Sequence, residues 1–311
     1  MNRAARILRH WRAPAEPVGA LTIGNFDGVH LGHQQVLAET AGHARALHGA
    51  AVAVTFHPHP REVLIPQAPV RRLSRLHERL IWLLEAGMDY VLLLHFDAKL
   101  AAMPAERFIA RLHEVLGFRH LHVGYDFAFG AGRKGDARLA QTLGERLGFT
   151  VSQAAPFVLD GAVVSSSRIR SAIEAADFAL AKRLLGRPFV ISGRVGRGDA
   201  RGRLLGFPTA NISLKGLVHP PPGVYAVRAR TRSRQWHGAA YIGLRPTFHG
   251  QDMRLEVHLF DDHPDLYRQR LWVEFVARIR EDRAFPSRAE LVRQIAEDCR
   301  KAREMLESLP G

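Results

Sequence analysis

The sequence predicts two domains: an α/β domain built on a parallel sheet, followed by a small all-β barrel domain with a C-terminal helix. Its 311 residues exceed the roughly 100–200 residues of a typical single domain. Up to about residue 185, apolar strand-like runs alternate with helical stretches. Beyond that point, strand-like runs are separated by Gly- and Pro-rich turns. We therefore expect domains over residues 1–185 and 186–311.

Four short apolar runs predict the sheet of the first domain, and each is long enough for one buried strand. In order, these runs are ALTIG, AVAVTF, YVLLLHF and LHVGY. Helical patterns lie between and after them, namely HQQVLAETAGHARALHG, LHERLIWLLEAG, PAERFIARLHEVLGF and DARLAQTLGERLGF. Strands that alternate with helices of this length predict a parallel sheet covered on both faces.

The pattern changes near Gly186, where the first domain ends. SSSRIRSAIEAADFALAKRLLG predicts two short helices, which Pro188 then ends. The strand-like runs that follow have no helix between them and predict a small barrel: FVISGRV, GVYAVRAR, WHGAAYIG, RLEVHLFD and LWVEFVARI. The final stretch predicts a long amphipathic helix, with Ser287 as its N-cap and Glu290 completing a capping box.

Composition narrows the classes of function. The net charge is +14, but the basic residues are scattered rather than gathered in a block. This favours a solvated Arg-rich surface, with phosphate-bearing substrates explaining part of the charge, and we expect no nucleic-acid partner. The chain has no run of ~18 apolar residues, no signal peptide and a single cysteine, Cys299, so we expect a cytoplasmic protein without membrane contact. Weak self-association is left open.

A motif at the end of the first long apolar run carries the strongest functional signal. GNFDGVHLGH spans Gly24 to His33 and leads directly into a predicted helix. The N-terminus of such a helix attracts phosphate, and His30 and His33, three residues apart, share one of its faces. Two imidazoles can therefore donate to the oxygens of one reacting phosphate. A single histidine here would more often be a cap or solvated, but the whole combination is far more specific.

Three further segments are expected at the same edge of the sheet. TFHPHP ends the second strand and places His57 there, because ligands bind beyond the carboxyl ends of parallel strands. A metal at His57 and His59 is disfavoured, since no third ligand is near in sequence. VGYDFAFGAGRKGD contains a formal G-x-G-x-x-G, but this motif follows the fourth predicted strand, whereas a dinucleotide site follows the first. We instead expect a flexible Gly-rich loop beside the phosphate site. VSSSRIRSAI offers serines that cap a helix and arginines that can reach phosphate.

The second domain has its own candidate site in GRVGRGDARGRLLGFPTANI. Its glycines can wrap phosphates with backbone N–H groups or simply form a barrel loop, and the stretch matches no Walker A or protein-kinase loop. Thr209 and Asn211 share a face in an extended segment and suit a Mg²⁺ ion that also carries phosphate oxygens. Glu256, in the middle of a strand, either forms an ion pair or accepts a proton from a substrate hydroxyl.

At this point both halves resemble one family. H-x-G-H resembles the signature of the nucleotidyltransferase superfamily, and LGFPTAN with the later IGLRPTF and LEVHLFD is similar to riboflavin kinase. With TFHPHP, VGYDFAFG, SSSRIR and PPGVYAV, the whole chain resembles prokaryotic bifunctional riboflavin kinase/FAD synthetases. The resemblance implies a Rossmann-like nucleotidyltransferase domain, then a kinase barrel. It also implies riboflavin, FMN and ATP as substrates, Mg²⁺ as cofactor, and FMN and FAD as products.

The resemblance also implies roles for individual residues. Glu256 would be the kinase base, and Thr209 and Asn211 would hold Mg²⁺. The expected kinase loop glycines are Gly193, Gly198, Gly202 and Gly206. His30 and His33 would act on the ATP phosphates in the first domain. The other residues expected around ATP and FMN there are Gly24, Asn25, Asp27, His57, Asp126, Ser165, Ser166 and Arg170.

Two departures from the family and two rival hypotheses remain. Ser167 stands where the family commonly has Thr, and Tyr241 stands where many members carry Asn. One rival hypothesis keeps only one activity, with the other domain vestigial. The other is a basic nucleic-acid-binding or regulatory protein. The intact histidine pair and Glu256 weigh against both.

Overall fold

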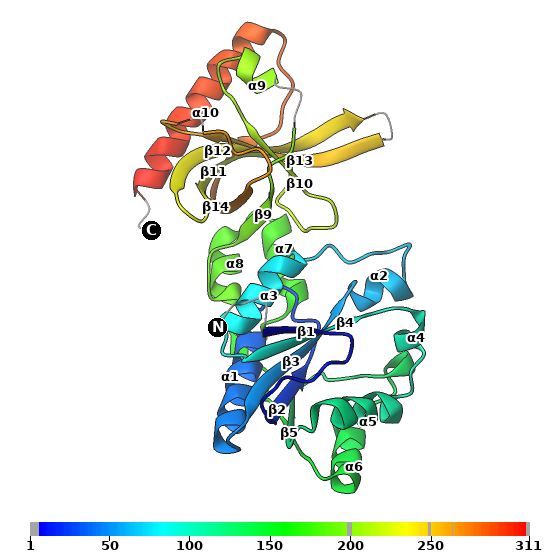
Figure 1. Cartoon of the computed structure of the whole chain (residues 1–311). Helices are drawn as coiled ribbons and strands as arrows, with labels where there is room; N and C mark the ends of the chain where they lie inside the picture. Colours follow the sequence, from blue (N-terminus) through cyan, green and yellow to red (C-terminus); the bar gives the residue numbers. More distant parts are fainter. Residues whose placement is uncertain (1–5, 198–200, 248–249, 263, 309–311) are drawn as a thin grey trace. The chain divides into compact units, whose positions relative to one another are not determined.

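The computed structural model describes residues 6–197, 201–247, 250–262 and 264–308. The chain divides into two compact units, Met1–Ser166 and Ser167–Gly311. Figure 1 labels most of their helices and strands.

The first unit is built on a six-stranded sheet in the order β1-β4-β3-β2-β5-β6, and all of its strand pairs are parallel. The four predicted apolar runs are strands β2 to β5, which confirms the expected sheet. Two shorter strands, which their sequence does not mark as apolar runs, lie at the edges. The strands are β1 (Ile7–Arg9), β2 (Val18–Ile23), β3 (Ala50–His57), β4 (Tyr90–His95), β5 (His120–Val123) and β6 (Thr150–Gln153).

Helices cover both faces of this sheet, as the alternating pattern predicts. Residues of β2 divide between the faces: Leu21 and Ile23 pack in a buried cluster with α5, whereas Ala20 packs in a second cluster with α1 and α3. The larger helices are α1 (Leu31–Ala46), α3 (Leu76–Glu85), α5 (Ala105–Leu116) and α6 (Ala137–Leu147). Smaller elements are α2 (Pro60–Leu64), α4 (Ala98–Ala101), the 3₁₀ turn Ala131–Arg133, β7 (Val158–Leu159) and β8 (Ala162–Val163).

The strand order fixes where a ligand can bind. After β2 the chain moves outward to β3 and β4 on one side, and then returns to β5 and β6 on the other. The loops that leave β2 and β5 therefore diverge, and open α/β sheets bind ligands at such a switch point. Because the pairs are parallel, the segments that follow β2, β3 and β5 all begin at one edge of the sheet.

The second unit carries a six-stranded antiparallel sheet in the order β10-β13-β12-β11-β14-β9. The Gly196 amide donates to the Asn211 carbonyl at 2.9 Å, so the two ends of the sheet meet and the barrel is nearly closed. This confirms the predicted barrel. The strands are β9 (Val190–Arg194), β10 (Ala210–Ser213), β11 (Gly223–Arg230), β12 (Gln235–Thr247), β13 (Gly250–Leu259) and β14 (Arg270–Glu281).

Four helices accompany the barrel. The two predicted short helices are α7 (Ser166–Glu174), which starts at the last residue of the first unit, and α8 (Phe178–Leu185). The C-terminal helix is α10 (Arg288–Ser308), and the Glu290 amide donates to the Ser287 hydroxyl at 3.2 Å, as expected of an N-cap. The expectation of no helix among the strands is wrong, because α9 (Arg201–Leu204) lies between β9 and β10.

Helices α8 and α10 pack on the barrel through apolar contacts. Phe178 of α8 stacks among Phe189, Tyr225 and Phe275, three buried rings of the barrel. On a different face, Ala302 and Leu306 of α10 cover Ala226 and Ala239 of strands β11 and β12.

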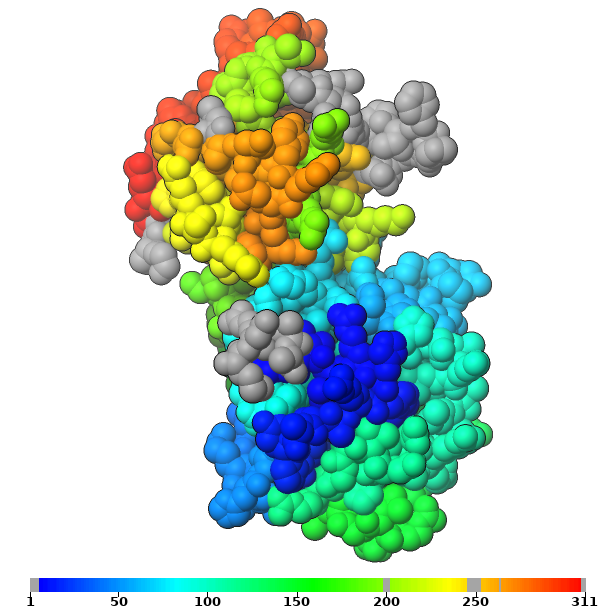
Figure 2. All heavy atoms as spheres, viewed as in Figure 1, coloured from blue at the N-terminus to red at the C-terminus, as the bar shows by residue number. Residues whose placement is uncertain are grey.

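Figure 2 shows β1 at the surface of the first unit, in dark blue, as expected of an edge strand. Over the described ranges of the chain, no helix combines the length and the apolar character needed to cross a membrane.

Candidate active sites

The histidine loop, residues 24–33, leaves β2 at the switch point. Its start is fixed to the neighbouring strand, because the Gly24 amide donates to the Val54 carbonyl at 3.0 Å. Gly28 has φ +78°, and a Cβ atom there would lie 2.9 Å from the side chain of Leu73. Glycine is therefore required at this position, both for the backbone conformation and for space.

Asp27 holds this loop in place through hydrogen bonds of its carboxylate. Its carboxylate is buried and accepts from the Leu73 amide at 3.0 Å and the Ser74 amide at 3.3 Å. The Ser74 hydroxyl in turn accepts from the Gly28 amide at 3.1 Å. Asp27 is one of the residues expected around ATP and FMN, and its carboxylate ties the loop to the segment that precedes α3.

His30 and His33 meet at the beginning of α1, as their spacing predicts. His30 is the N-cap, and its Nδ1 accepts from the His33 amide at 3.4 Å. The two rings stack with centroids 3.6 Å apart, and the Phe26 ring packs edge-on against His33 at 5.3 Å. The pair is therefore held in one orientation at a helix N-terminus, where an anion is favoured.

Arg79 is a buried cation that sequence analysis missed. It projects from α3 and donates to the Asn25 carbonyl at 2.8 Å and to the Phe56 carbonyl at 2.7 Å. Burial lowers its pKa to about 10, against the opposing effect of Asp27. A signal was available, because Arg79 stands three residues after Leu76 and four before the buried Leu83, on the core-facing side of its helix.

His57 is the last residue of β3, as expected, and is half-buried. Burial lowers its pKa, and the nearby Arg79 and Arg72 cations lower it further. The ring is thus neutral at pH 7. Asp126 lies in the turn after β5 and is exposed. Both residues follow strands that end at the same edge of the sheet.

The serine segment meets the histidine loop. The Ser166 hydroxyl donates to the Asp27 carbonyl at 3.3 Å, and the Val164 carbonyl would lie 3.5 Å from a Cβ atom on Gly32. Ser165 precedes α7 and is half-buried. Arg170 lies four residues beyond Ser166 on α7 and falls within the second compact unit.

In the second unit, the three residues expected to serve the kinase reaction come together. Asn211 of β10 lies directly opposite Glu256 of β13. The Thr209 hydroxyl donates to a Glu256 carboxylate oxygen at 3.2 Å, and the Asn211 amide nitrogen donates to the Thr209 carbonyl at 3.3 Å. A hydroxyl, an amide and a carboxylate, which offer the oxygen ligands that Mg²⁺ prefers, thus lie close together in the barrel.

Tyr241 joins this group from β12, directly opposite Glu256. Burial raises the pKa of its hydroxyl to about 12, and Asp282 and Glu256 add to the shift. A Cβ atom on Gly243 would overlap the Tyr241 ring, so glycine at position 243 makes room for the tyrosine. The sequence marked Tyr241 as a departure, and the structure places it beside the proposed base.

The glycines predicted for the kinase loop differ in their backbone conformation and in their place in the fold. A Cβ atom on Gly202 would lie 2.4 Å from the Phe207 carbonyl oxygen, and Gly206 has φ +87°, so both allow the tight turn that leads to Thr209. Gly193 lies within β9, opposite Leu271. Gly198 lies outside the described residues.

Comparisons with known proteins show the family of the chain. The family model for FAD synthetase matches residues 13–168, and the family model for riboflavin kinase matches residues 185–306. The bifunctional riboflavin kinase/FMN adenylyltransferase of Escherichia coli K12 is 43% identical over 295 residues, which cover 94% of each chain. The chain belongs to this bifunctional family. The Pseudomonas fluorescens and Bacillus subtilis members are 45% and 35% identical over about nine-tenths of the chain.

One solved structure has the same fold as this chain. It is described as a macrolide-efflux protein from Streptococcus pneumoniae, is 29% identical, covers 98% of this chain and all of its own, and superposes with a TM-score of 0.84. The two family models meet the two candidate sites in order: the histidine loop lies in the FAD synthetase match, and Thr209, Asn211 and Glu256 lie in the riboflavin kinase match.

Proposed function

We propose that this chain converts riboflavin to FMN in its second unit and FMN to FAD in its first unit, with ATP as the donor of the transferred group in both reactions. The observation that carries the proposal is the pairing of two family models with two separate constellations suited to phosphate chemistry. The macrolide efflux ascribed to the S. pneumoniae protein is not extended to this chain, because the family models and curated relatives agree on flavin chemistry.

In the kinase reaction, we assign the base to Glu256. Its carboxylate would take the proton from the terminal hydroxyl of the riboflavin side chain as the hydroxyl oxygen bonds to the γ-phosphorus and ADP leaves. Thr209 and Asn211 would hold Mg²⁺, which when bound offsets the charge of the phosphates. The hydroxyl at 3.2 Å from Glu256 supports this, because it fixes the carboxylate without neutralising it.

In the adenylyl transfer, we assign phosphate stabilisation to His30 and His33. An oxygen of the FMN phosphate would bond to the α-phosphorus of ATP, and the bond to pyrophosphate would break. The negative charge that gathers on the oxygens around the α-phosphorus in the transition state is offset by hydrogen-bond donors held in advance of the reaction. The stacked rings at the start of α1 meet this requirement.

For the other residues of the first site, the contacts favour two kinds of role. We propose that Gly24, Asn25, Asp27 and Ser166 shape the loop, since they form hydrogen bonds to other parts of the chain. His57, Asp126, Ser165 and Arg170 remain candidates for contact with ATP or FMN. A cytoplasmic location also stays a prediction.

The test is a time course with the purified chain, riboflavin, ATP and Mg²⁺, in which the flavins are separated by chromatography. We expect FMN to appear first and FAD to follow. FMN without FAD would remove the adenylyl transfer from the proposal, and no conversion of riboflavin or of added FMN would overturn both halves.

A further inference from the structure

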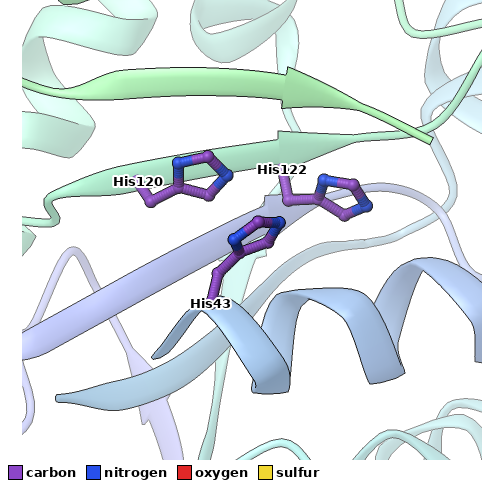
Figure 3. A group of neighbouring side chains, drawn as sticks. All are labelled: His43, His120 and His122. Carbon is purple, nitrogen blue, oxygen red and sulfur yellow. The ribbon is translucent and has the colours of Figure 1, made fainter. Parts of the chain in front are cut away.

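Three histidines of the first unit form a cluster away from the histidine loop. His43 projects from α1, and His120 and His122, two residues apart on β5, share the face of the sheet that α1 covers (Figure 3). A potential ligand atom of each lies within 4.8 Å of those of the other two. The ring centroid of His43 is 4.1 Å from that of His120 and 5.3 Å from that of His122.

The partners of His120 decide which of its nitrogens carries the proton. Nδ1 lies 2.7 Å from the Thr150 hydroxyl, and that hydroxyl donates its own hydrogen to the Arg119 carbonyl at 3.4 Å. We assign the proton of the neutral ring to Nδ1, because Thr150 then accepts from His120 while donating to Arg119. In a neutral ring, Nε2 then carries a lone pair.

The same reasoning applies to His122. Its Nε2 lies 2.7 Å from a carboxylate oxygen of Glu39, which accepts hydrogen bonds and cannot donate. Glu39 is itself held one turn along α1 by the Gln35 amide at 2.9 Å. His122 thus carries its proton on Nε2, and its Nδ1 has the lone pair. A carboxylate that fixes a histidine through its far nitrogen is the arrangement that supports metal-binding histidines.

Both lone pairs meet at one hydroxyl group. His120 Nε2 and His122 Nδ1 each lie 2.7 Å from the oxygen of Ser152. That hydroxyl has a single hydrogen, so it can donate to only one of the two nitrogens. Both rings are buried, and burial disfavours the charged imidazolium relative to the neutral, electron-donating form.

We propose that His43, His120 and His122 bind one divalent ion of the zinc class, which fastens α1 to strand β5. Imidazole nitrogens suit late first-row ions such as Zn²⁺ and Co²⁺, and three of them leave a fourth position for the Ser152 hydroxyl or a water molecule. Nitrogens about 2.1 Å from one ion lie about 3.4 Å apart in a tetrahedral site, so the half-buried His43 closes the site by a small rotation.

The site would act at a distance from the chemistry. His43 lies 13 residues after His30 along the same helix, roughly 20 Å at 1.5 Å per residue. An ion here would hold the far part of the helix whose beginning carries His30 and His33. The role is therefore structural and separate from the Mg²⁺ proposed with ATP.

The experiment titrates the full chain with Zn²⁺ after dialysis against a chelator, without ATP or flavin, and measures heat of binding and the unfolding midpoint. A parallel titration with Co²⁺ follows the absorption bands of a four-coordinate site. We expect one equivalent of Zn²⁺ to bind and to raise the unfolding midpoint. His43→Ala and His43→Gln, at a half-buried position, should weaken the binding at least tenfold.

His48→Asn is the matched control, because His48 is exposed, just beyond α1, and has φ +48°, which asparagine tolerates. It should bind Zn²⁺ like the original chain. Failure of the original chain to bind Zn²⁺ or Co²⁺ would overturn the proposal. Binding that survives both His43 variants would overturn it too, since the ion would then sit at other histidines, such as His57 and His59.

Discussion

Arg79 is a buried cation that holds the end of β3 and the histidine loop at fixed positions. Replacing it with methionine removes the guanidinium hydrogen bonds to the Asn25 and Phe56 carbonyls, and the Thr55 contact to Asn25 that remains is longer, at 3.3 Å. We expect Arg79→Met to lower the rate of FAD formation by about 10–100-fold, because small displacements of positioning groups cost this much.

FMN formation is the internal control for this variant, since the kinase residues lie in the other compact unit. It should stay within about twofold of the original rate. Arg79→Lys should recover part of the lost activity, because a lysine can donate to one of the two carbonyls. An Arg79→Met chain that makes FAD at the original rate would contradict the positioning role.

His57 is expected to titrate below the ordinary value of 6.5, chiefly because of burial and then because of Arg79 and Arg72. A pKa that is lower in the folded chain than in the unfolded chain means that protonation favours unfolding. The contribution of His57 to stability is thus complete above pH 6.5 and is lost as the pH falls below it. An NMR titration of the His57 ring should show a midpoint below 6.5, and a midpoint at or above that value would contradict the described surroundings.

At the scale of elements, helix α8 belongs with the barrel. Phe178 contacts Phe189, Tyr225 and Phe275, and the compact second unit begins at Ser167. The boundary at residue 186, predicted from the change in the pattern of strands and helices, would separate this helix from those rings. We expect a fragment of residues 167–311 to unfold at a higher temperature than a fragment of residues 186–311, measured by circular dichroism.

A point variant isolates the same contact. Phe178→Ala in the longer fragment should cost about 3–5 kcal/mol of stability, as is usual for a buried phenylalanine. Leu204→Ala, at a residue 75% exposed on α9, should change stability by less than about 0.5 kcal/mol. Equal midpoints for the two fragments, or equal effects of the two variants, would place α8 outside the barrel's core.

At the scale of the whole molecule, patterns that span several residues were predictable from the sequence. Buried runs such as Ala51–Phe56 alternate with helices and could be read as a parallel sheet. The H-x-G-H and PTAN motifs also marked the ends of elements where the structure places them. The strands and the two motifs were predictable because each depends on residues that are neighbours in the sequence.

Contacts between distant segments were not predictable in the same way. Asp27 stands in a phosphate motif, and the motif gives no sign that its carboxylate binds amides 46 and 47 residues away. Edge strands such as Ile7–Arg9 lack a long apolar run because only part of their surface is buried. The cluster of His43, His120 and His122 arises only when α1 packs on β5.

The central claim is that two units of one chain each perform one phosphate reaction. The most direct test measures FMN formation from riboflavin and FAD formation from added FMN, for Glu256→Gln and for a His30→Asn/His33→Asn double variant. We expect Glu256→Gln to lower FMN formation by about 10²–10⁴-fold and to leave FAD formation intact, and the double variant to do the reverse. If either folded variant lost both activities, or neither, the division of labour would be contradicted.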